Sequence, residues 1–483
     1  MQKLFKLYDD HPIVKEVIDK LENSGFEAYI VGGAVRDSLL GHDVDDIDIT
    51  TNATPYDIAK IFPKERVIPT GIKFGTVTVL GDDENVEVTT FRTDGLYEDG
   101  RRPESVKFCR TLEEDLGCRD FTINAIAFNP NVGLIDPYNG LNDIFLETVK
   151  TVGDPIERFS EDSLRILRAI RFATTLGFTI EEETLSAAHF LKNQLRRVSG
   201  PRIGKELSKM LVSGNFSSSF DSYQDIIIAA VPELSSMKDY NQHNKYHHYN
   251  LWDHTMLLLA GVEKNNLVYA PKGVAESFMW AAMFHDCGKP AVQSTGDNGM
   301  WHYYSHEQVS AKMAKQAMQR MALPRQIVNA TNAIIQMHGY PLDLKIPLIL
   351  RFLNRLSDYY PEPQELFIDM VIFKMLDKAS KKDSSFYLEN LNNLPAIAEH
   401  FDYDYKSIIK NYASHCMFDG IPYTIKMMPI TGEDLMEATS REAGPWIDKT
   451  LEVTLRHIMG GLIGYSKDEV LAEAIKMSSN FKD

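Results

Sequence analysis

Short runs of alternating apolar and polar residues fill the first 150 positions of the chain. EAYIVGG, DIDITT and NVEVTTFR alternate with a period of two, which is typical of strands that bury one face. Two stretches with helical spacing, HPIVKEVIDKLENSG and GAVRDSLLG, lie among these runs. The pattern predicts an α+β domain over residues 1–150.

The pattern changes at Asp154, because strand signals nearly vanish there and helical spacing continues to the C-terminus. SEDSLRILRAIRFATTLG predicts one continuous helix with Ser160 as its N-cap. A chain of 483 residues is too long for one core. We therefore expect a helical neck over 151–240, a third domain over 241–385 and a helical tail over 386–483.

The composition excludes several classes of function and says less about the fold. The chain is 44% apolar and 25% charged, and its N-terminus MQKLFKLYDDHP has no apolar signal region, so we expect a cytoplasmic protein without membrane contact. Its four cysteines form no CxxC pair and fit free thiols in a reducing compartment. A net charge of −17 argues against a general nucleic-acid coat.

Although the chain is acidic overall, it contains one basic stretch, LKNQLRRVSGPRIGKELSKM over 191–210. A solvated helix surface and an RNA-facing surface both fit such a charge pattern. The candidate RNA contacts are Arg196, Arg197, Arg202 and Lys205.

The stretch DVDDIDIT crowds four carboxylates into six residues. In a strand, Asp46 and Asp48 point to one face and the intervening isoleucine to the other. Neighbouring carboxylates repel unless a cation intervenes, and hard oxygen ligands suit Mg²⁺. Glu87 in NVEVTT, on a nearby strand, is the candidate third acid of a catalytic magnesium site. A solvated, polar strand end is the alternative.

The stretch just before it, YIVGGAVRDSLLG, predicts strand, glycine turn and helix. Gly32 and Gly33 would let backbone N–H groups approach a phosphate at the start of the helix. Arg36 would add a charge-assisted contact to a triphosphate, with Asp37 orienting it. A plain tight turn is the alternative for the glycines alone.

Together, VGGAVRDSLLG and DDIDITTNATP resemble the head domain of class II tRNA nucleotidyltransferases and the related bacterial poly(A) polymerases. The resemblance implies a polymerase-β-like nucleotidyltransferase head, followed by an all-α neck. It also implies that Asp46 and Asp48 carry Mg²⁺ and that Gly32, Gly33 and Arg36 hold the triphosphate.

EEDLGCRDFTINAIAFNP looks like the ribose-recognition segment of that family. The resemblance implies that Arg119 and Asp120 contact the nucleotide, with Asn124 close by. Cys118 stands where the family usually has a second arginine, so one cation is missing.

SEDSLRILRAIRFA resembles the nucleotide-selecting helix of the family. A carboxylate only accepts and a guanidinium only donates, so Asp162 would accept from the exocyclic amine of C or A while Arg165 donates to the adjacent ring nitrogen. U and G reverse both groups, and two unpaired buried groups at about 1–3 kcal/mol each reject them by roughly two decades. Arg168 would stack on or buttress this site.

The stretch FRTDGLYEDGRRPESVKFCRTLEEDL over 91–116 looks like the flexible loop of CCA-adding enzymes. The resemblance therefore implies addition of C, C and A to the 3′ end of tRNA from CTP and ATP, with the helical tail contacting tRNA. An A-adding tRNA nucleotidyltransferase or a poly(A) polymerase stays open. So do an HD phosphohydrolase with a nucleotide-binding head and a non-catalytic RNA-binding scaffold.

The stretches NLWDHTMLLL, AAMFHDCGKP and FKMLDKAS supply His254, His285, Asp286 and Asp377 on apolar helices. Such residues can meet as a site for a divalent metal of unknown identity, such as Mn, Fe, Ni, Zn or Mg. HDCGKP resembles the HD phosphohydrolase domain. By that resemblance His306 and His338 are extra ligands and Lys289 binds phosphate; we interpret His247 and His248 as surface residues. The implied activity is a phosphodiesterase or phosphatase, and an inactive module is the alternative.

Overall fold

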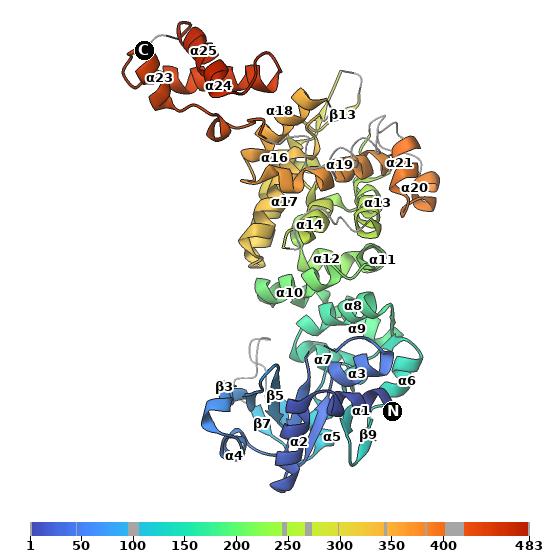
Figure 1. Cartoon of the computed structure of the whole chain (residues 1–483). Coiled ribbons are helices and arrows are strands. Elements are labelled where there is room, and N and C mark those ends of the chain that lie inside the picture. The colour runs from blue at the N-terminus through green and yellow to red at the C-terminus, as the bar shows by residue number, and fades with distance from the viewer. Residues whose placement is uncertain are drawn as a thin grey trace. The chain divides into compact units, whose positions relative to one another are not determined.

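The computed structural model describes residues 2–44, 46–94, 106–243, 249–265, 273–297, 299–341, 345–381, 384–400 and 420–481. Contacts divide the chain into two compact units. The first unit comprises residues 1–215 and 219–230, and the second comprises residues 216–218 and 231–483. Figure 1 shows the first unit in blue to green and the second in green to red. The expected four-part division stays a prediction.

A seven-stranded mixed sheet forms the centre of the first unit, with strand order β3-β4-β5-β2-β1-β8-β9. The pair β2 and β5 is parallel, and the other neighbours in this sheet are antiparallel. The strands are β1 (Ala28–Val31), β2 (Asp48–Thr51), β3 (Val67–Gly71), β4 (Thr76–Leu80), β5 (Asn85–Thr90), β8 (Ala127–Asn129) and β9 (Gly133–Ile135). A separate pair joins β6 (Arg92–Asp94) to β7 (Val106–Phe108).

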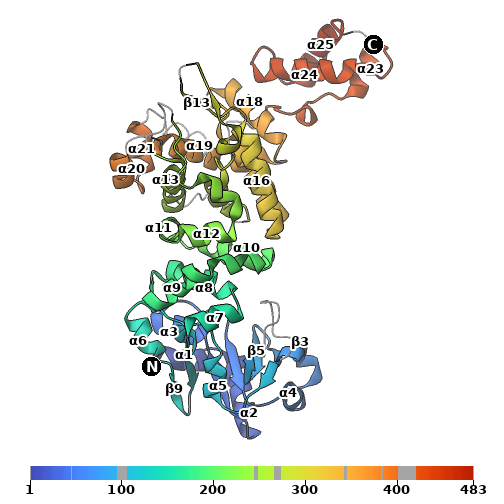
Figure 2. The ribbon, with the colours of Figure 1, turned by 180° about the vertical axis from the view of Figure 1, so that it is seen from behind.

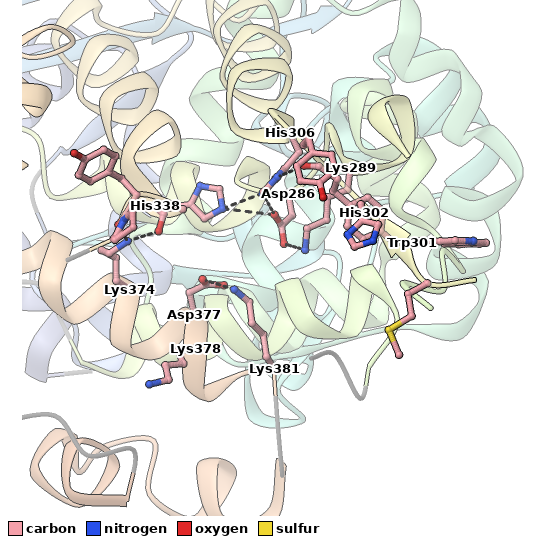
Figure 3. A pocket seen from close by; sticks show the side chains of 16 residues that line it. Asp286, Lys289, Trp301, His302, His306, His338, Lys374, Asp377, Lys378 and Lys381 are labelled. Carbon is pink, nitrogen blue, oxygen red and sulfur yellow. Dashed lines mark hydrogen bonds and ion pairs between the residues drawn. The ribbon is translucent and has the colours of Figure 1, made fainter. Parts of the chain in front are cut away.

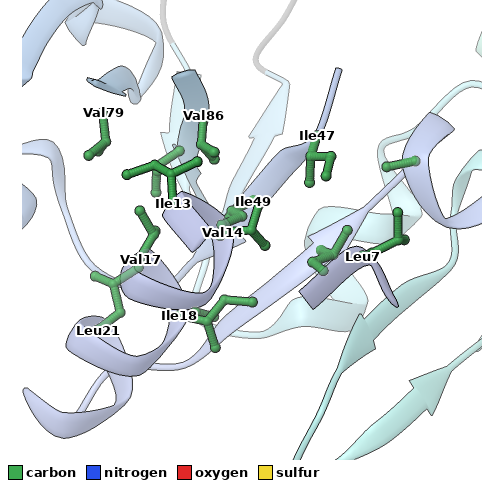
Figure 4. Packing of buried hydrophobic residues seen from close by; sticks show 14 of the residues in the cluster. Leu7, Ile13, Val14, Val17, Ile18, Leu21, Ile47, Ile49, Val79 and Val86 are labelled. Carbon is green, nitrogen blue, oxygen red and sulfur yellow. The ribbon is translucent and has the colours of Figure 1, made fainter. Parts of the chain in front are cut away.

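Helices cover this sheet, as the ribbon shows from both sides (Figures 1 and 2). They are α1 (Gln2–Asp9), α2 (Pro12–Asn23), α3 (Gly33–Leu40), α4 (Pro55–Ile61), α5 (Leu112–Gly117) and α6 (Gly140–Phe145). The apolar face of α2 packs on β-strand side chains such as Ile49 and Val86 (Figure 4). A second cluster, which includes Val31, Phe91 and Leu116, fills another part of the unit. The predicted α+β head is confirmed.

The predicted continuous helix after Asp154 is wrong. Helix α7 (Pro155–Glu161) ends before Asp162, whose φ of −141° and ψ of 102° are extended, and α8 (Leu164–Leu176) begins after it. Ser163, not Ser160, is the N-cap residue of α8. The rest of the first unit holds β10 (Thr148–Val149), β11 (Thr179–Ile180), α9 (Glu182–Leu191), α10 (Gly200–Leu211) and α12 (Gln224–Ala230).

In the described residues of the second unit, the regular structure is helical apart from the short pair β12 (Ser294–Thr295) and β13 (Trp301–His302). Its first helices are α13 (Leu251–Lys264), α14 (Glu276–Phe284), α15 (Lys289–Val292), α16 (His306–Arg320) and α17 (Arg325–His338). They are followed by α18 (Ile346–Ser357), α19 (Pro363–Ala379), α20 (Ser384–Glu389), α21 (Leu394–His400), α23 (Gly432–Thr439), α24 (Trp446–Met459) and α25 (Lys467–Ser478). Helix α11 (Phe216–Ser222) lies where the chain passes between the units. Within the described ranges, every helix is too short or too polar to cross a bilayer.

Candidate functional site

Asp46 and Asp48 are exposed, while Ile47 and Ile49 between and beyond them are buried. The alternation places both carboxylates on the face of β2 opposite to the core. Asp46 lies just before the strand, which begins at Asp48. The two acids therefore share one face, as the sequence pattern predicts.

Glu87 lies beside this pair, because β2 and β5 run in parallel with Asp48 directly opposite Glu87. Both side chains line a cavity of about 430 Å³. Asp48 is exposed as a whole residue, but the surrounding cavity walls keep water away from its carboxyl. This desolvation, together with Glu87 and Asp46, raises the pKa of Asp48 above its ordinary value, against the opposing effect of Arg119. The three acids form an acceptor-only cluster in which like charges crowd.

The other walls of this cavity carry most of the arginines that the sequence singles out. Arg119, Arg165, Arg168 and Arg202 line it together with Asp120 and Asp162. Gly32 has a φ of +73°, and a Cβ there would stand 2.8 Å from Nη1 of Arg119. The glycine is therefore required both for its backbone conformation and for the space that Arg119 occupies.

Arg36 is buried, and its donors are engaged within the protein. Its Nε and Nη2 donate to the carboxylate of Asp37 at 2.8 and 2.7 Å, and Nη1 donates to Oδ1 of Asn124 at 2.5 Å. The guanidinium also lies over the ring of Phe172, 4.9 Å from its centroid. Asp37 thus orients Arg36, as expected. Neither Arg36 nor Gly33 lines the cavity, and their contact with a triphosphate stays a prediction.

Asp120 is the centre of a buried network. It accepts from Nε of Arg168 at 2.7 Å, from Nδ2 of Asn124 at 3.0 Å and from its neighbour Phe121 N at 2.9 Å. Burial would raise the pKa of Asp120, but Arg168 and Asn124 outweigh it and lower the pKa to about 2. Arg168 also approaches Glu206 on α10 at 3.8 Å. Arg168 therefore buttresses the site through Asp120, one of the two roles expected of it.

Asp162, at the break between α7 and α8, and Arg165, in the first turn of α8, both line the cavity. Arg202 on α10 donates to both carboxylate oxygens of Asp162, at 2.5 and 3.2 Å. Nη1 of Arg165 donates to Oε2 of Glu161 at 2.6 Å. Arg202, expected on the RNA-binding surface, thus orients Asp162 in this structure.

The remaining basic candidates lie on the surface. Arg196, Arg197 and Lys205 are exposed, and no ion pair involves them among the residues that the structure describes. Their charges are available for phosphate groups, so the expected RNA contact stays a prediction.

In the second unit, all six predicted metal ligands meet. Asp286 lies between two groups of imidazoles, His254 with His285 and His306 with His338. Figure 3 shows the second group beside Asp286. Its Oδ2 is 3.1 Å from Nε2 of His285 and 3.5 Å from Nε2 of His254. Its Oδ1 is 3.0 Å from Nε2 of His306 and 3.6 Å from Nε2 of His338. On the first group, Oδ1 of Asp377 is 3.2 Å from Nε2 of His254.

Hydrogen bonds at the far side of the rings fix their tautomers. Nδ1 of His285, His306 and His338 lies 2.9, 2.8 and 2.7 Å from the carbonyl oxygens of Ala282, Tyr303 and Ile335. A carbonyl only accepts, so each Nδ1 carries the proton and each Nε2 turns a lone pair inward.

The carboxylates add to this acceptor character. Burial would raise the pKa of Asp286 and of Asp377, but neighbouring His285 and Lys289 for Asp286, and Lys381 and His254 for Asp377, hold both pKa values well below the ordinary range. In the described part of the chain, Oδ1 of each carboxyl has no hydrogen-bond donor. Lone pairs thus converge on buried space, an arrangement that fits a divalent cation.

Lysines around this cluster form a feature that the sequence interpretation missed, apart from Lys289. Lys374 and Lys378 lie on α19 and Lys381 lies just after its end, at spacings of four and three residues, and all three line a cavity of about 530 Å³ next to the predicted ligands. Nζ of Lys381 bonds Oδ2 of Asp377 at 2.7 Å, and Nζ of Lys289 bonds Oδ2 of Asp286 at 2.6 Å. Their spacing of four and three residues around Asp377 is the sequence signal that could have revealed them.

Asp115 is the residue that sequence reasoning missed in the first unit. It is buried at the cavity, accepts from the backbone N–H of Arg92 at 3.1 Å and lies 3.5 Å from Nη2 of Arg119. It therefore positions Arg119. Part of the predicted loop over 91–116, namely 95–105, lies outside the described residues, as do His247 and His248.

Three family models match the chain. Residues 28–150 match the poly A polymerase head domain, 177–237 match the probable RNA and SrmB-binding site of polymerase A, and 255–377 match the HD domain. The matches confirm the predicted combination of a polymerase-type head, a helical neck and an HD domain.

Two curated relatives, both CCA-adding enzymes, are similar to this chain over part of its length. The chain is 43% identical over 240 residues to a CCA-adding enzyme of Lactobacillus helveticus, covering 50% of this chain and 60% of that one. It is 49% identical over 195 residues to one of Bacillus cytotoxicus, covering 40% and 49%. The chain thus spans about half the length of these curated relatives.

Structural similarity covers more of the chain than these sequence matches do. The crystal structure of a Bacillus stearothermophilus CCA-adding enzyme in complex with CTP aligns over 96% of both chains, with 24% identity and a TM-score of 0.65. A Thermotoga maritima CCA-adding enzyme complexed with tRNA also aligns over 96% of both, with 20% identity and a TM-score of 0.55. The chain shares the fold of these enzymes, as predicted.

Proposed function

We propose that this protein is a tRNA nucleotidyltransferase that adds C, C and A to tRNA 3′ ends from CTP and ATP, without a nucleic-acid template. The observation that carries the proposal is the register of Asp48 against Glu87, which places both acids on the wall of an arginine-lined cavity. Asp46 lies on the same face just before the strand. Acids hold the catalytic cation and arginines bind the triphosphate, so this cavity suits nucleotidyl transfer. The likeness to CCA-adding enzymes supports the same reaction.

Mg²⁺ fits the acid cluster. The cluster offers only hard oxygen acceptors. Loss of water around Asp48, and to a smaller extent the like charges of Glu87 and Asp46, raise its pKa, and a bound cation would offset both effects. Asp46, Asp48 and Glu87 would hold the metal, which supplies activation of the tRNA hydroxyl and neutralisation of the leaving pyrophosphate. Arg119, held by Asp115, would bind the phosphate oxygens.

Base selection follows from the two side chains at the helix break. Arg202 occupies one side of the Asp162 carboxylate, and a carboxylate with about four lone-pair sites can still accept from the exocyclic amine of C or A. Arg165 donates to the adjacent ring nitrogen. Arg202 thereby holds the specificity residue in place, and the exposed Arg196, Arg197 and Lys205 would contact the tRNA backbone.

The test is incubation of the full chain with tRNA lacking its 3′ end, with labelled CTP alone, ATP alone, and both. We expect CTP alone to give two additions and both together to give three. Asp48→Ala should abolish incorporation, and exposed Asp83→Ala should not, with circular dichroism showing that both stay folded. Incorporation by Asp48→Ala would refute the metal assignment, and addition of A alone would favour an A-adding enzyme or a poly(A) polymerase.

A second activity, hydrolysis of phosphoesters, is favoured by the six-ligand cluster of the second unit. The inward lone pairs of His285, His306 and His338, with His254 and two carboxylates beside them, fit one or two divalent ions, which would supply a metal hydroxide. Lys289 would neutralise the phosphate. Because Asp286 belongs to both groups of ligands, Asp286→Ala should abolish hydrolysis of adenosine 2′,3′-cyclic phosphate in Mn²⁺ or Ni²⁺ and leave CTP incorporation unchanged. Absence of hydrolysis in the unaltered protein with each of these metals would indicate an inactive module.

A further inference from the structure

The cavity of about 530 Å³ beside the HD ligands is large for a lone phosphate. Ligand pockets for molecules of nucleotide size begin at roughly 300 Å³. Asp286, Asp377, His306 and His338 line this cavity, and so do Lys374 and Lys378 on α19 and Lys381 just after it. A phosphate bound by these charged residues accounts for only part of the lining.

Aromatic side chains line another part of the same cavity. Trp301, His302, Tyr303 and Tyr304 follow one another along β13 and the turn after it, and all four line the cavity. Two of them have structural partners: the hydroxyl of Tyr303 donates to the carbonyl of Gln242 at 2.5 Å, and the ring of Trp301 packs against His243 at 4.4 Å.

The other two aromatic residues, His302 and Tyr304, form what we term the aromatic ledge. Their rings are parallel within 7°, with centroids 5.4 Å apart, and Tyr304 is 73% exposed. An exposed, prealigned aromatic ring is a surface on which a planar base stacks, whichever base it is, because every base has a π face.

The ledge lies close to the metal ligands along the chain. Tyr304 precedes the ligand His306 by two residues, which limits the separation of their Cα atoms to about 7 Å. The turn between them is fixed, since Nδ1 of His306 bonds the carbonyl of Tyr303 at 2.8 Å. A phosphate at the ligands therefore places the base of the same nucleotide within reach of the ledge.

We propose that the aromatic ledge binds the base of a nucleotide whose phosphate lies at the HD ligands, so that this site takes nucleotides in preference to simple phosphate esters and without selecting among bases. The inference rests on the proposed phosphohydrolase site. It adds specificity-determining residues to that site: the lysines and ligands recognise the phosphate, and His302 and Tyr304 recognise the presence of a base.

The test compares a nucleotide with a base-free ester in the full-length protein. In Mn²⁺, the KM for adenosine 2′,3′-cyclic phosphate should rise about tenfold in Tyr304→Ala, within the range for loss of one base–aromatic stack. The kcat should stay unchanged, as should both constants for glycerol 2-phosphate. Tyr304→Phe should restore the KM, and Tyr465→Ala, which removes an exposed tyrosine away from the cavity, should have no effect.

Equilibrium dialysis gives a readout that is independent of hydrolysis. Adenosine and uridine 2′-monophosphates should each bind about tenfold more weakly to Tyr304→Ala than to the unaltered protein, and ribose 5-phosphate should bind both equally. An unchanged affinity for the nucleotides, or an equal loss for ribose 5-phosphate, would overturn the ledge. If no ester is hydrolysed but nucleotide binding still depends on Tyr304, the phosphohydrolase proposal fails and the ledge stands.

Discussion

Asp120→Asn should destabilise the first unit by about 2–3 kcal/mol. The pKa of Asp120 falls from its ordinary 3.8 to about 2, and about 1.4 kcal/mol per pKa unit makes this depression worth about 2.5 kcal/mol. The amide of the introduced asparagine also turns N–H groups toward Arg168. The mostly buried guanidinium then keeps only the more distant Glu206 as an acidic partner among the ion pairs described for it. Loss of one partner of a buried pair costs about 3–5 kcal/mol, and Glu206 keeps the effect at the lower end.

Urea unfolding of the full chain can assign this loss to the first unit. All four tryptophans, Trp252, Trp280, Trp301 and Trp446, lie in the second unit. The transition of the first unit, seen by far-UV circular dichroism, should therefore shift in Asp120→Asn, while the midpoint from tryptophan fluorescence stays unchanged. Asp83→Asn, on an exposed side chain, is the matched control. A shift below about 1 kcal/mol would refute the reasoning.

The pH dependence of this loss has a defined sign. A carboxyl with a depressed pKa in the folded state stabilises the protein above its unfolded pKa, near 4, and this contribution disappears as the pH falls through about 2. The difference between the parent protein and Asp120→Asn should therefore be constant from pH 5 to 8 and shrink below pH 4. A difference that grows on acidification would contradict the ionised state of Asp120.

Three further substitutions probe the first unit. Gly32→Ala should cost about 1–3 kcal/mol in the same unfolding assay, since it places a Cβ 2.8 Å from Arg119 at a φ of +73°; a neutral result would mean that Arg119 relocates freely. Arg202→Met should release Asp162 and reduce discrimination of CTP over UTP about tenfold, and unchanged discrimination would count against its orienting role. Arg197→Ala should weaken tRNA binding and reduce the slope of log K against log salt by about one, whereas an unchanged slope would remove Arg197 from the RNA surface.

The local patterns of the head were sufficient to predict its acid cluster. A period of two over DIDITT fixes which residues face the core, so burial of Ile47 and Ile49 puts Asp46 and Asp48 on the other face. The pairing of β2 with β5 is a long-range feature, and the sequence could suggest Glu87 only as a nearby candidate. Of the six predicted HD ligands, residue types suggested His254, His285, Asp286 and Asp377, and a resemblance suggested His306 and His338. No periodicity relates helices so far apart, so the sequence could not show that these residues meet.

The break at Asp162 could not be predicted from local sequence. SEDSLRIL contains no glycine or proline, and its residues are compatible with a helix. The extended conformation of Asp162 accompanies a bidentate pair with Arg202, 40 residues further along the chain. The bond of Arg36 to Asn124, 88 residues further along, is likewise tertiary and could not be predicted, whereas its pairing with the neighbouring Asp37 was expected.

Lys374 joins two helices of the second unit through hydrogen bonds to backbone carbonyls. Its ammonium bonds the carbonyls of His338 and Tyr340, at the end of α17, while the lysine itself lies one turn before Asp377 on α19. Burial lowers the pKa of this lysine to about 8, so it remains mostly cationic at neutral pH. The two helices that carry His338 and Asp377 are thereby held in register by a contact that involves no metal ion. The spacing of this part of the proposed metal site is therefore set by the polypeptide itself.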